Sequence, residues 1–390
     1  MKVTIFSKYI VGIMLVLAII AGVAGYFIGS SAVPTVAPAT LTLIQTVVRT
    51  YTAPVTVPVS LTPTTPTTPL TTPMFTPPTL TKPVTLRIVT HSVGSSWYLM
   101  GSAIAAVVKN YLPPGSSVDV MTGPGTIGNI PLVSRGDAEL AITMDTYVYY
   151  AIKGMSPFNE SYTNVAMVVN DLSPYFLLEA VPRDWAKANN VKTFDDIVRM
   201  IKEGKKVVIV TGSVGSLDEY ATKILLQLYG LTYDDVKKAG GDIIFGATDD
   251  YRVEVFKQGL AQVFSDVCTY EHPTWQTLTA GTDIVVLPIN KTIVEKFKEY
   301  GFSPYVVEKG TYKGMDTDIL TAGILACLIA STEVPPEVIY YVTKAIVENK
   351  DKLVSIFAGF KYFDIEHSYE SLVPLHRGAE LYFRSVGFLR

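Results

Sequence analysis

Two stretches rich in serine and glycine combine residue types suited to binding a small anion. The first lies in Leu86 to Val108, LRIVTHSVGSSWYLMGSAIAAVV, and the second in Lys206 to Leu228, KVVIVTGSVGSLDEYATKILLQL. Each has a short apolar run, then a Gly/Ser loop, then apolar residues at helical spacing, so each predicts a strand, a loop and a helix. Backbone N–H groups and hydroxyls at the start of such a helix favour a negative group.

Other loops that follow short apolar runs carry similar residues, together with carboxylates and aromatic rings. We predict ligand contacts from hydroxyl, carboxylate, aromatic and glycine positions in all these loops: Ser95, Ser96, Trp97, Tyr98, Thr122, Thr126, Asp145, Thr146, Ser213, Gly215, Ser216, Asp218, Asp266 and Tyr270. Local roles compete with binding at some of them. Ser216 with Glu219 fits a helix-capping box, and Asp218 suits the first turn of a helix.

These residues do not form a recognisable catalytic set. The sequence has no nucleophile elbow, no clustered metal ligands and no GxxxxGK loop, and its four histidines are scattered. A carboxylate pair of Asp145 and Asp266 is the remaining catalytic alternative. We therefore predict a binding protein, not an enzyme, without a cofactor. No arginine lies in the loops, so backbone amides would have to bind an anion unless Arg183 or Arg252 reaches in from elsewhere.

The elements that position these loops are short strands alternating with helices, which predicts an α/β fold with mostly parallel sheets. Ligands of such sheets bind beyond the carboxyl ends of the strands, where all these loops lie. Val165 to Val169 and Tyr175 to Ala180 predict two strands leading out of a first lobe, and Thr332 to Ile356 predicts a helix. We expect two lobes facing one cleft: residues 84–178 and 271–390 in the first, and residues 179–270 in the second.

Residues 1–83 predict a membrane attachment and a spacer. Ile10 to Ile28 has 19 residues without a charge, preceded by Lys2 and Lys8, which predicts a membrane anchor within residues 1–33 and an extracytoplasmic remainder. A cleaved signal peptide is the alternative. Residues 34–83 are rich in Thr and Pro and predict an extended stalk, either O-glycosylated or a plain disordered linker.

Composition narrows the class of protein further. The 390 residues carry a net charge of −3 without a basic patch, so nucleic acid is not an expected partner. The sequons at Asn159 and Asn290 predict glycosylation on exposed loops of an exported domain. Whether Cys268 and Cys327 pair stays open, because small core cysteines are the commoner case.

Five motifs in order resemble the TAXI group of TRAP-transporter solute receptors. Gly94 to Ala105, GSSWYLMGSAIA, is similar to the family's G-G-x-Y-Y-x-x-G-x-A-I-A. Thr122-Gly123 with Asn129, followed by Gly136 to Ile142, resembles T-G-G-S-x-x-N-L and G-E-A-D-L-A-I. Gly215-Ser216 with Glu219 resembles a G-S-G-T-E helix start. Lys309 to Asp316 and Pro374 to Tyr382 resemble two late signatures.

The resemblance implies a two-lobed periplasmic-binding-protein-like fold of type II. It also implies a receptor that closes on a small organic solute, such as glutamate, glutamine or a related carboxylate. The receptor would deliver this solute to a TRAP-type membrane permease from the cell surface, and the stalk makes an archaeal source plausible. A surface sensor module for a signalling partner is the alternative function.

Departures from the family pattern make the expected pocket more acidic. Met144-Asp145-Thr146 stands where the family often has Gln-Ser-Asp, Leu217-Asp218 replaces Gly-Thr, and Phe264-Ser265-Asp266 replaces an aromatic run. Carboxylates crowded together repel a dicarboxylate. We therefore expect either a solute with a positive group, such as an amino acid or an amine, or a carboxylate held through a cation such as Ca²⁺.

Overall fold

The computed structural model describes residues 76–389. The predicted anchor (1–33) and residues 34–75 of the predicted stalk lie outside the described residues. Residues 76–83, the end of that stalk, form neither helix nor strand. Within the described range, no helix combines the length and apolar character needed to cross a membrane.

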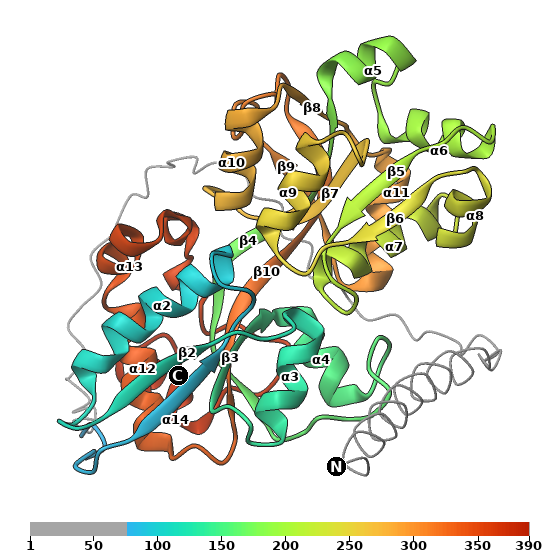
Figure 1. The fold of residues 1–390 in the computed structure, drawn as a ribbon. Helices are drawn as coiled ribbons and strands as arrows, with labels where there is room; N and C mark the ends of the chain where they lie inside the picture. The colour runs from blue at the N-terminus through green and yellow to red at the C-terminus, as the bar shows by residue number, and fades with distance from the viewer. Residues whose placement is uncertain (1–75, 390) are drawn as a thin grey trace, which may run out of the picture. The chain divides into compact units, whose positions relative to one another are not determined.

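A ten-stranded mixed sheet runs through the described residues, in the order β2-β1-β3-β10-β4-β7-β5-β6, with β8 on β4 and β9 on β10. The strands are β1 (Thr85–Val89), β2 (Ser117–Met121), β3 (Leu140–Met144), β4 (Val165–Pro182), β5 (Val208–Thr211), β6 (Asp242–Phe245), β7 (Val263–Cys268), β8 (Ile284–Val286), β9 (Ser303–Val307) and β10 (Ile319–Ser331). Helices alternate with the strands (Figure 1). The predicted α/β class is therefore confirmed.

Two long strands join two groups of parallel strands. β1 pairs with β2 and β3 in parallel, and this first group attaches through β3 to residues 326–330 of β10. β5 pairs with β6 and β7 in parallel, and this second group attaches through β7 to residues 176–180 of β4. β4 and β10 pair with each other, from Val165 opposite Ser331 to Phe176 opposite Gly323 (Figure 1). The two predicted strands in residues 165–180 are thus one strand, because β10 pairs with it across the interval between them.

β8 and β9 belong beside the second group. β8 pairs with residues 180–182 of β4, and β9 pairs with residues 319–323 of β10. These pairings lie at the same ends of β4 and β10 as the second group, although the predicted lobe boundaries assign residues 271–318 to the first lobe. The lobe boundaries themselves remain a prediction.

Several helices begin where a side chain caps them, as at Ser95, Thr193 and Ser216. They are α2 (Ser96–Val108), α3 (Thr126–Ser134), α4 (Asp145–Lys153), α5 (Arg183–Asn189), α6 (Phe194–Lys202), α7 (Leu217–Leu228), α8 (Tyr233–Lys238), α9 (Asp249–Lys257), α10 (Pro273–Gly281), α11 (Lys291–Lys296), α12 (Pro336–Val347), α13 (Lys350–Ile356) and α14 (Arg377–Ser385), with short 3-10 turns η1 (Lys109–Tyr111), η2 (Phe297–Tyr300), η3 (Ala358–Tyr362) and η4 (Ile365–His367). The single helix predicted for Thr332 to Ile356 is two helices, because Glu348 ends α12 and α13 begins after Asn349.

Both cysteines lie inside the sheet as free thiols. Cys268 ends β7 and Cys327 lies on β10, and both are buried. Burial also raises the pKa of each thiol well above its ordinary value. In the structure they act as small core residues and do not pair.

Candidate functional site

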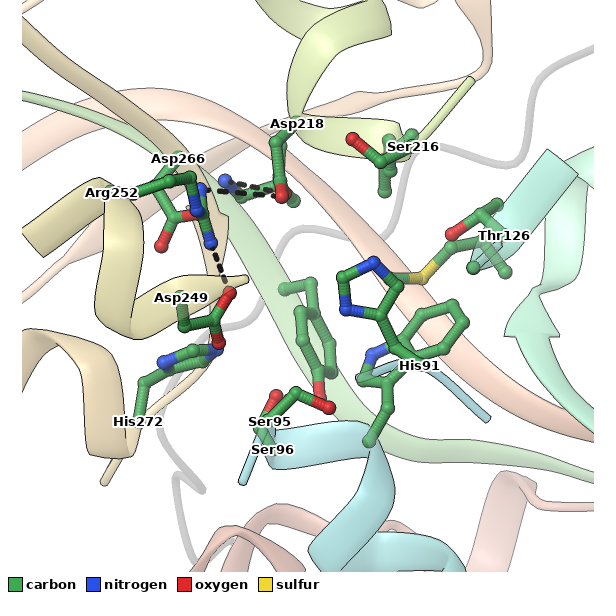
Figure 2. A pocket seen from close by; sticks show the side chains of 16 residues that line it. His91, Ser95, Ser96, Thr126, Ser216, Asp218, Asp249, Arg252, Asp266 and His272 are labelled. Carbon is green, nitrogen blue, oxygen red and sulfur yellow. Dashed lines mark hydrogen bonds and ion pairs between the residues drawn. The ribbon is translucent and has the colours of Figure 1, made fainter. Parts of the chain in front are cut away.

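Loops from both groups of strands meet at one small cavity. It has a volume of about 40 Å³ and is lined from β1, β2, β3 and β4 on one side and from β5, β6 and β7 on the other: His91, Ser95, Ser96, Trp97, Gly125, Thr126, Met144, Tyr175, Ser216, Leu217, Asp218, Asp249, Arg252, Asp266, Val267 and His272 (Figure 2). Most of these residues follow the carboxyl end of a parallel strand. The cavity therefore occupies the edge of the sheet that the strand-loop-helix pattern predicts.

The same tetrapeptide, Ser-Val-Gly-Ser, leads into one helix on each side of the cavity. Gly94 and Gly215 have φ of +85° and +88°, a left-handed conformation that glycine adopts without strain. The serine that follows each glycine is the N-cap. Ser95 Oγ accepts a hydrogen bond from Tyr98 N at 3.2 Å, and Ser216 Oγ accepts one from Glu219 N at 3.3 Å. Each hydroxyl keeps its own proton for donation toward the cavity.

A third helix, α3, begins at Thr126 beside the same cavity. Asn129 holds this loop in place, because its amide donates to the carbonyls of Thr90 and Ile142 at 2.7 and 3.0 Å and accepts from Gly125 N at 3.1 Å. These bonds join the loop after β2 to the ends of β1 and β3. Together, α2, α3 and α7 direct N-terminal N–H groups and hydroxyls at one place, an arrangement that favours an anionic group.

A neighbouring part of the wall carries one arginine among three aspartates, and one of these, Asp218, belongs to the first turn of α7 (Figure 2). The Arg252 guanidinium lies 2.6 Å from Asp266 Oδ1, 2.6 Å from Asp249 Oδ1 and 3.4 Å from Asp218 Oδ2. Trp275 Nε1 donates to Asp266 and Thr274 Oγ1 donates to Asp249, each at 2.8 Å. Arg252 is thus committed to the protein's own carboxylates.

Burial and this crowding change the protonation of the cluster. Burial, and then the charge of Asp266, raise the pKa of Asp218 to about 8, although Arg252 opposes the shift. Burial opposes ionisation of Asp249 as well, but Arg252 holds its pKa below the ordinary value. Burial lowers the pKa of both His91 and His272, so both imidazoles are neutral at physiological pH.

An aromatic wall completes the cavity. Tyr175, which lies on β4 between the two groups of strands, places its hydroxyl 3.0 Å from Ser96 Oγ. The Trp97 ring packs edge-on against the Tyr175 ring, with centroids 6.0 Å apart. These residues link α2 to the strand that joins both halves of the sheet.

The structure brings together part of the predicted set. Ser95, Ser96, Trp97, Thr126, Ser216, Asp218 and Asp266 line the cavity, whereas Tyr98, Thr122, Asp145, Thr146, Ser213, Gly215 and Tyr270 do not. The second set has other roles. Asp145 Oδ1 accepts from Thr146 N, Thr146 Oγ1 donates to Gly301 O, and Tyr270 stacks on Tyr362. Ser213 and Gly215 shape the turn before α7, and Thr122 is exposed.

Residues outside the predicted set contribute the other charges. His91, Asp249, Arg252 and His272 line the cavity, as do Tyr175, Met144 and Leu217. The sequence does indicate His91 as a candidate, because it follows Thr90 directly at the end of the first predicted strand. The sequence indicates Arg252 less clearly, because this residue lies on a helix and not in one of the loops that follow a predicted strand. His272 Nδ1 is buried without a hydrogen-bond partner in the described part of the chain.

In this conformation, the described residues do not form a site for a cation that would bridge the protein and its solute. Among residues 76–389, no group of three or more His, Cys, Asp or Glu side chains is arranged to hold a metal ion. Arg252 instead occupies the centre of the acidic cluster. Both sequons are exposed, although Asn290 also caps α11 by accepting from Thr292 N at 2.9 Å.

Comparisons with known proteins identify a family. A model of the NMT1-like family matches residues 88–387. No curated protein matches the chain. Similar solved structures include a TctC solute-binding protein from Polaromonas (15% identity, 78% of this chain and 99% of that chain, TM-score 0.41). A second is the periplasmic binding protein BugD (13% identity, 78% of this chain and 95% of that chain, TM-score 0.46). A third is MatC from Rhodopseudomonas palustris with bound malate (11% identity, 78% of this chain and 96% of that chain, TM-score 0.47). Similarity at this level does not identify a ligand.

Proposed function

The chain belongs to the NMT1-like family, and we propose that it is an extracytoplasmic receptor that encloses a small organic solute between its two groups of strands. One observation carries this proposal. Loops at the carboxyl ends of β1, β2 and β3 face loops at the carboxyl ends of β5, β6 and β7 across a single cavity. A solute held there touches both groups, so its binding is coupled to their separation.

The solute that suits this cavity carries a carboxylate. The N-termini of α2, α3 and α7 supply N–H groups and the hydroxyls of Ser95, Thr126 and Ser216. These donors are the groups that replace water around an anion, and no arginine is needed for that task. An amino acid or a related carboxylate is therefore the proposed class of solute.

Delivery to a membrane permease completes the proposed role. The five motifs that resemble TAXI receptors support a TRAP-type secondary transporter as the partner. The uncharged stretch Ile10 to Ile28 and the Thr/Pro-rich residues 34–83 support attachment to the cell surface. The receptor would then work without chemistry on its solute, which agrees with the absence of a catalytic motif in the sequence.

A cavity of about 40 Å³ has room for roughly three water molecules, so a complete amino acid requires the two groups to move apart and close again. The test is a thermal-shift screen of the full-length protein against amino acids, dicarboxylates, amines and sugars, with and without Ca²⁺ and a chelator. A solute at about 100 times its dissociation constant adds about 2.7 kcal/mol to the free energy of unfolding.

A matched pair of variants connects a binding solute to this cavity. Thr126→Val removes a hydroxyl from the cavity and should weaken binding by about tenfold, the effect of losing one hydrogen bond to a charged group. Thr343→Val makes the same change at a buried threonine within α12, outside the cavity, and should leave the dissociation constant unchanged. Failure of every solute class to stabilise the protein, or equal effects of both variants, would contradict the proposal.

A further inference from the structure

The cavity wall formed by Asp218, Asp249, Arg252 and Asp266 has more negative than positive groups. The single guanidinium of Arg252 contacts all three carboxyl groups. The neighbouring imidazoles of His91 and His272 add no charge when neutral. With all three aspartates ionised, the buried cluster would carry two uncompensated negative charges. A proton on one carboxyl group removes one of them, and a cation from the solute can do the same.

Asp218 is the carboxyl group from which a proton or a cation can be exchanged most easily. Asp266 is 1% exposed, and both its oxygens accept short hydrogen bonds, from Arg252 and Trp275. Asp249 is held in the same way by Arg252 and Thr274. Among residues 76–389, the Asp218 carboxyl group makes only longer contacts, 3.2 Å from Val267 N and 3.4 Å from Arg252, and it lines the cavity.

Burial and the facing carboxylates favour the neutral form of Asp218 in the absence of a solute, although Arg252 opposes them. α9 supplies Arg252 and Asp249, and β7 supplies Asp266 and the Cys268 thiol, while the Tyr175 hydroxyl on β4 stays protonated. The imidazoles of His91 and His272 lie in the same wall. Asp218 is therefore a buried acid beside two carboxylates that share one guanidinium, which is consistent with its raised pKa.

We propose that an ammonium group of the solute replaces the acid proton of Asp218, so that each solute molecule bound releases a proton to the solvent. The carboxyl O–H bond breaks, the proton leaves to water, and the carboxylate pairs with the ammonium group, so charge is conserved. The solute is then a zwitterion, with its carboxylate at the helix N-termini and its ammonium group at Asp218. This inference rests on the receptor function proposed above.

The test uses L-glutamate and glutarate, which differ by one amino group, and the full-length protein. Titration calorimetry in two buffers of different ionisation enthalpy measures the protons released. At about pH 7, L-glutamate should release close to one proton, and its dissociation constant should fall by up to about tenfold per unit rise in pH until the pKa of Asp218 is passed. Glutarate should bind more weakly and release none.

Asp218→Asn keeps the shape of a neutral Asp218 and should abolish the proton release and weaken L-glutamate binding. Asp250→Asn, an exposed change in the first turn of α9, is the matched control and should alter neither. The wild-type calorimetry decides the question even where Asp218→Asn folds poorly.

The outcomes separate this inference from the receptor function. L-glutamate binding with proton release that Asp218→Asn removes supports it. L-glutamate binding without proton release, or glutarate binding as tightly as L-glutamate, overturns it and leaves a receptor. Failure of both probes, together with failure of every solute class in the thermal-shift screen, overturns both proposals.

Discussion

Glu179 is a carboxyl group buried where β4 pairs with β7 of the second group of strands. It lies on β4 with no exposed surface, and its Oε1 accepts from Ser265 Oγ at 2.7 Å. Its Oε2 has no partner among the described residues. Ser265 continues the network to Thr222, also at 2.7 Å. Burial raises the pKa of Glu179 well above its ordinary value, with a smaller contribution from Asp266, so the folded protein holds a neutral acid here.

This neutral acid makes the stability of the protein depend on pH. The pKa of Glu179 is higher in the folded than in the unfolded chain, so the free energy of unfolding falls as pH rises above about 4.3, up to the folded pKa. Glu179→Gln should reduce that slope by about 1.4 kcal/mol per pH unit. Urea unfolding between about pH 5 and pH 9 measures it.

Exposed Glu366 provides the matched control, and Glu366→Gln should keep the full slope. Asp218 adds a separate decline in the free energy of unfolding up to about pH 8, because its pKa is also raised in the folded protein. The slope of Glu179→Gln therefore does not vanish below that pH. An unchanged slope in Glu179→Gln would show that Glu179 is ionised in the folded protein.

At the scale of elements, Arg252 holds the second side of the cavity together. Its guanidinium on α9 contacts Asp218 on α7 and Asp266 on β7, and α10 joins through Trp275. The side chain is almost fully buried and also lies over the Phe264 ring, 5.5 Å from its centroid. These elements are consequently positioned by a single buried cation as well as by the sheet.

Removing that cation should destabilise the fold strongly. Arg252→Met leaves buried carboxylates without their partner, which costs about 3–5 kcal/mol of unfolding free energy. The control is Arg183→Met. Arg183 pairs with Asp283 and Asp316, which are largely exposed, so its loss should cost about 1 kcal/mol or less. Denaturant unfolding of both variants measures the difference, and equal losses would mean that the buried cluster contributes little.

At the scale of the molecule, contacts beside the cavity bridge the two groups of strands. Tyr270 follows β7, and its ring stacks on Tyr362 of η3 with centroids 3.9 Å apart. η3 packs with α13 and α2 beside the first group. Thr146 on α4 donates to the carbonyl of Gly301, at 3.1 Å. Because the cavity is small and these contacts join the two groups of strands, this conformation corresponds to the closed state of the proposed receptor.

Weakening one bridging contact should shift the molecule toward an open conformation. Tyr362→Ala removes an aromatic pair worth about 0.5–1.5 kcal/mol, so solute affinity should fall by roughly two- to tenfold. Small-angle scattering should show a larger radius of gyration without solute. Phe388→Ala breaks a stack with Phe383 inside the C-terminal segment and is the control, which should change stability but not affinity. Equal affinities in Tyr362→Ala and the wild type would contradict a bridging role.

The sequence by itself determined the local features of this protein. The Ser-Val-Gly-Ser turns, the caps at Ser95 and Ser216 and the start of α6 after Thr193 all follow from residues within about four positions of one another. The α/β class follows from strands and helices alternating along the chain. Placing these loops at strand ends also follows, because each loop directly continues an apolar run.

Only the tertiary structure decided which loops meet and which side chains face the cavity. Arg252 and His272 reach the cavity because the sheet order places β7 beside β5. The residues next to them in sequence do not reveal this strand order. Thr146 and Tyr270 instead contact Gly301 and Tyr362, which are distant in sequence. The balance of charge around Asp218 likewise depends on side chains from α7, α9 and β7. Coulomb and desolvation energies depend on distances through space, and a single sequence does not specify them.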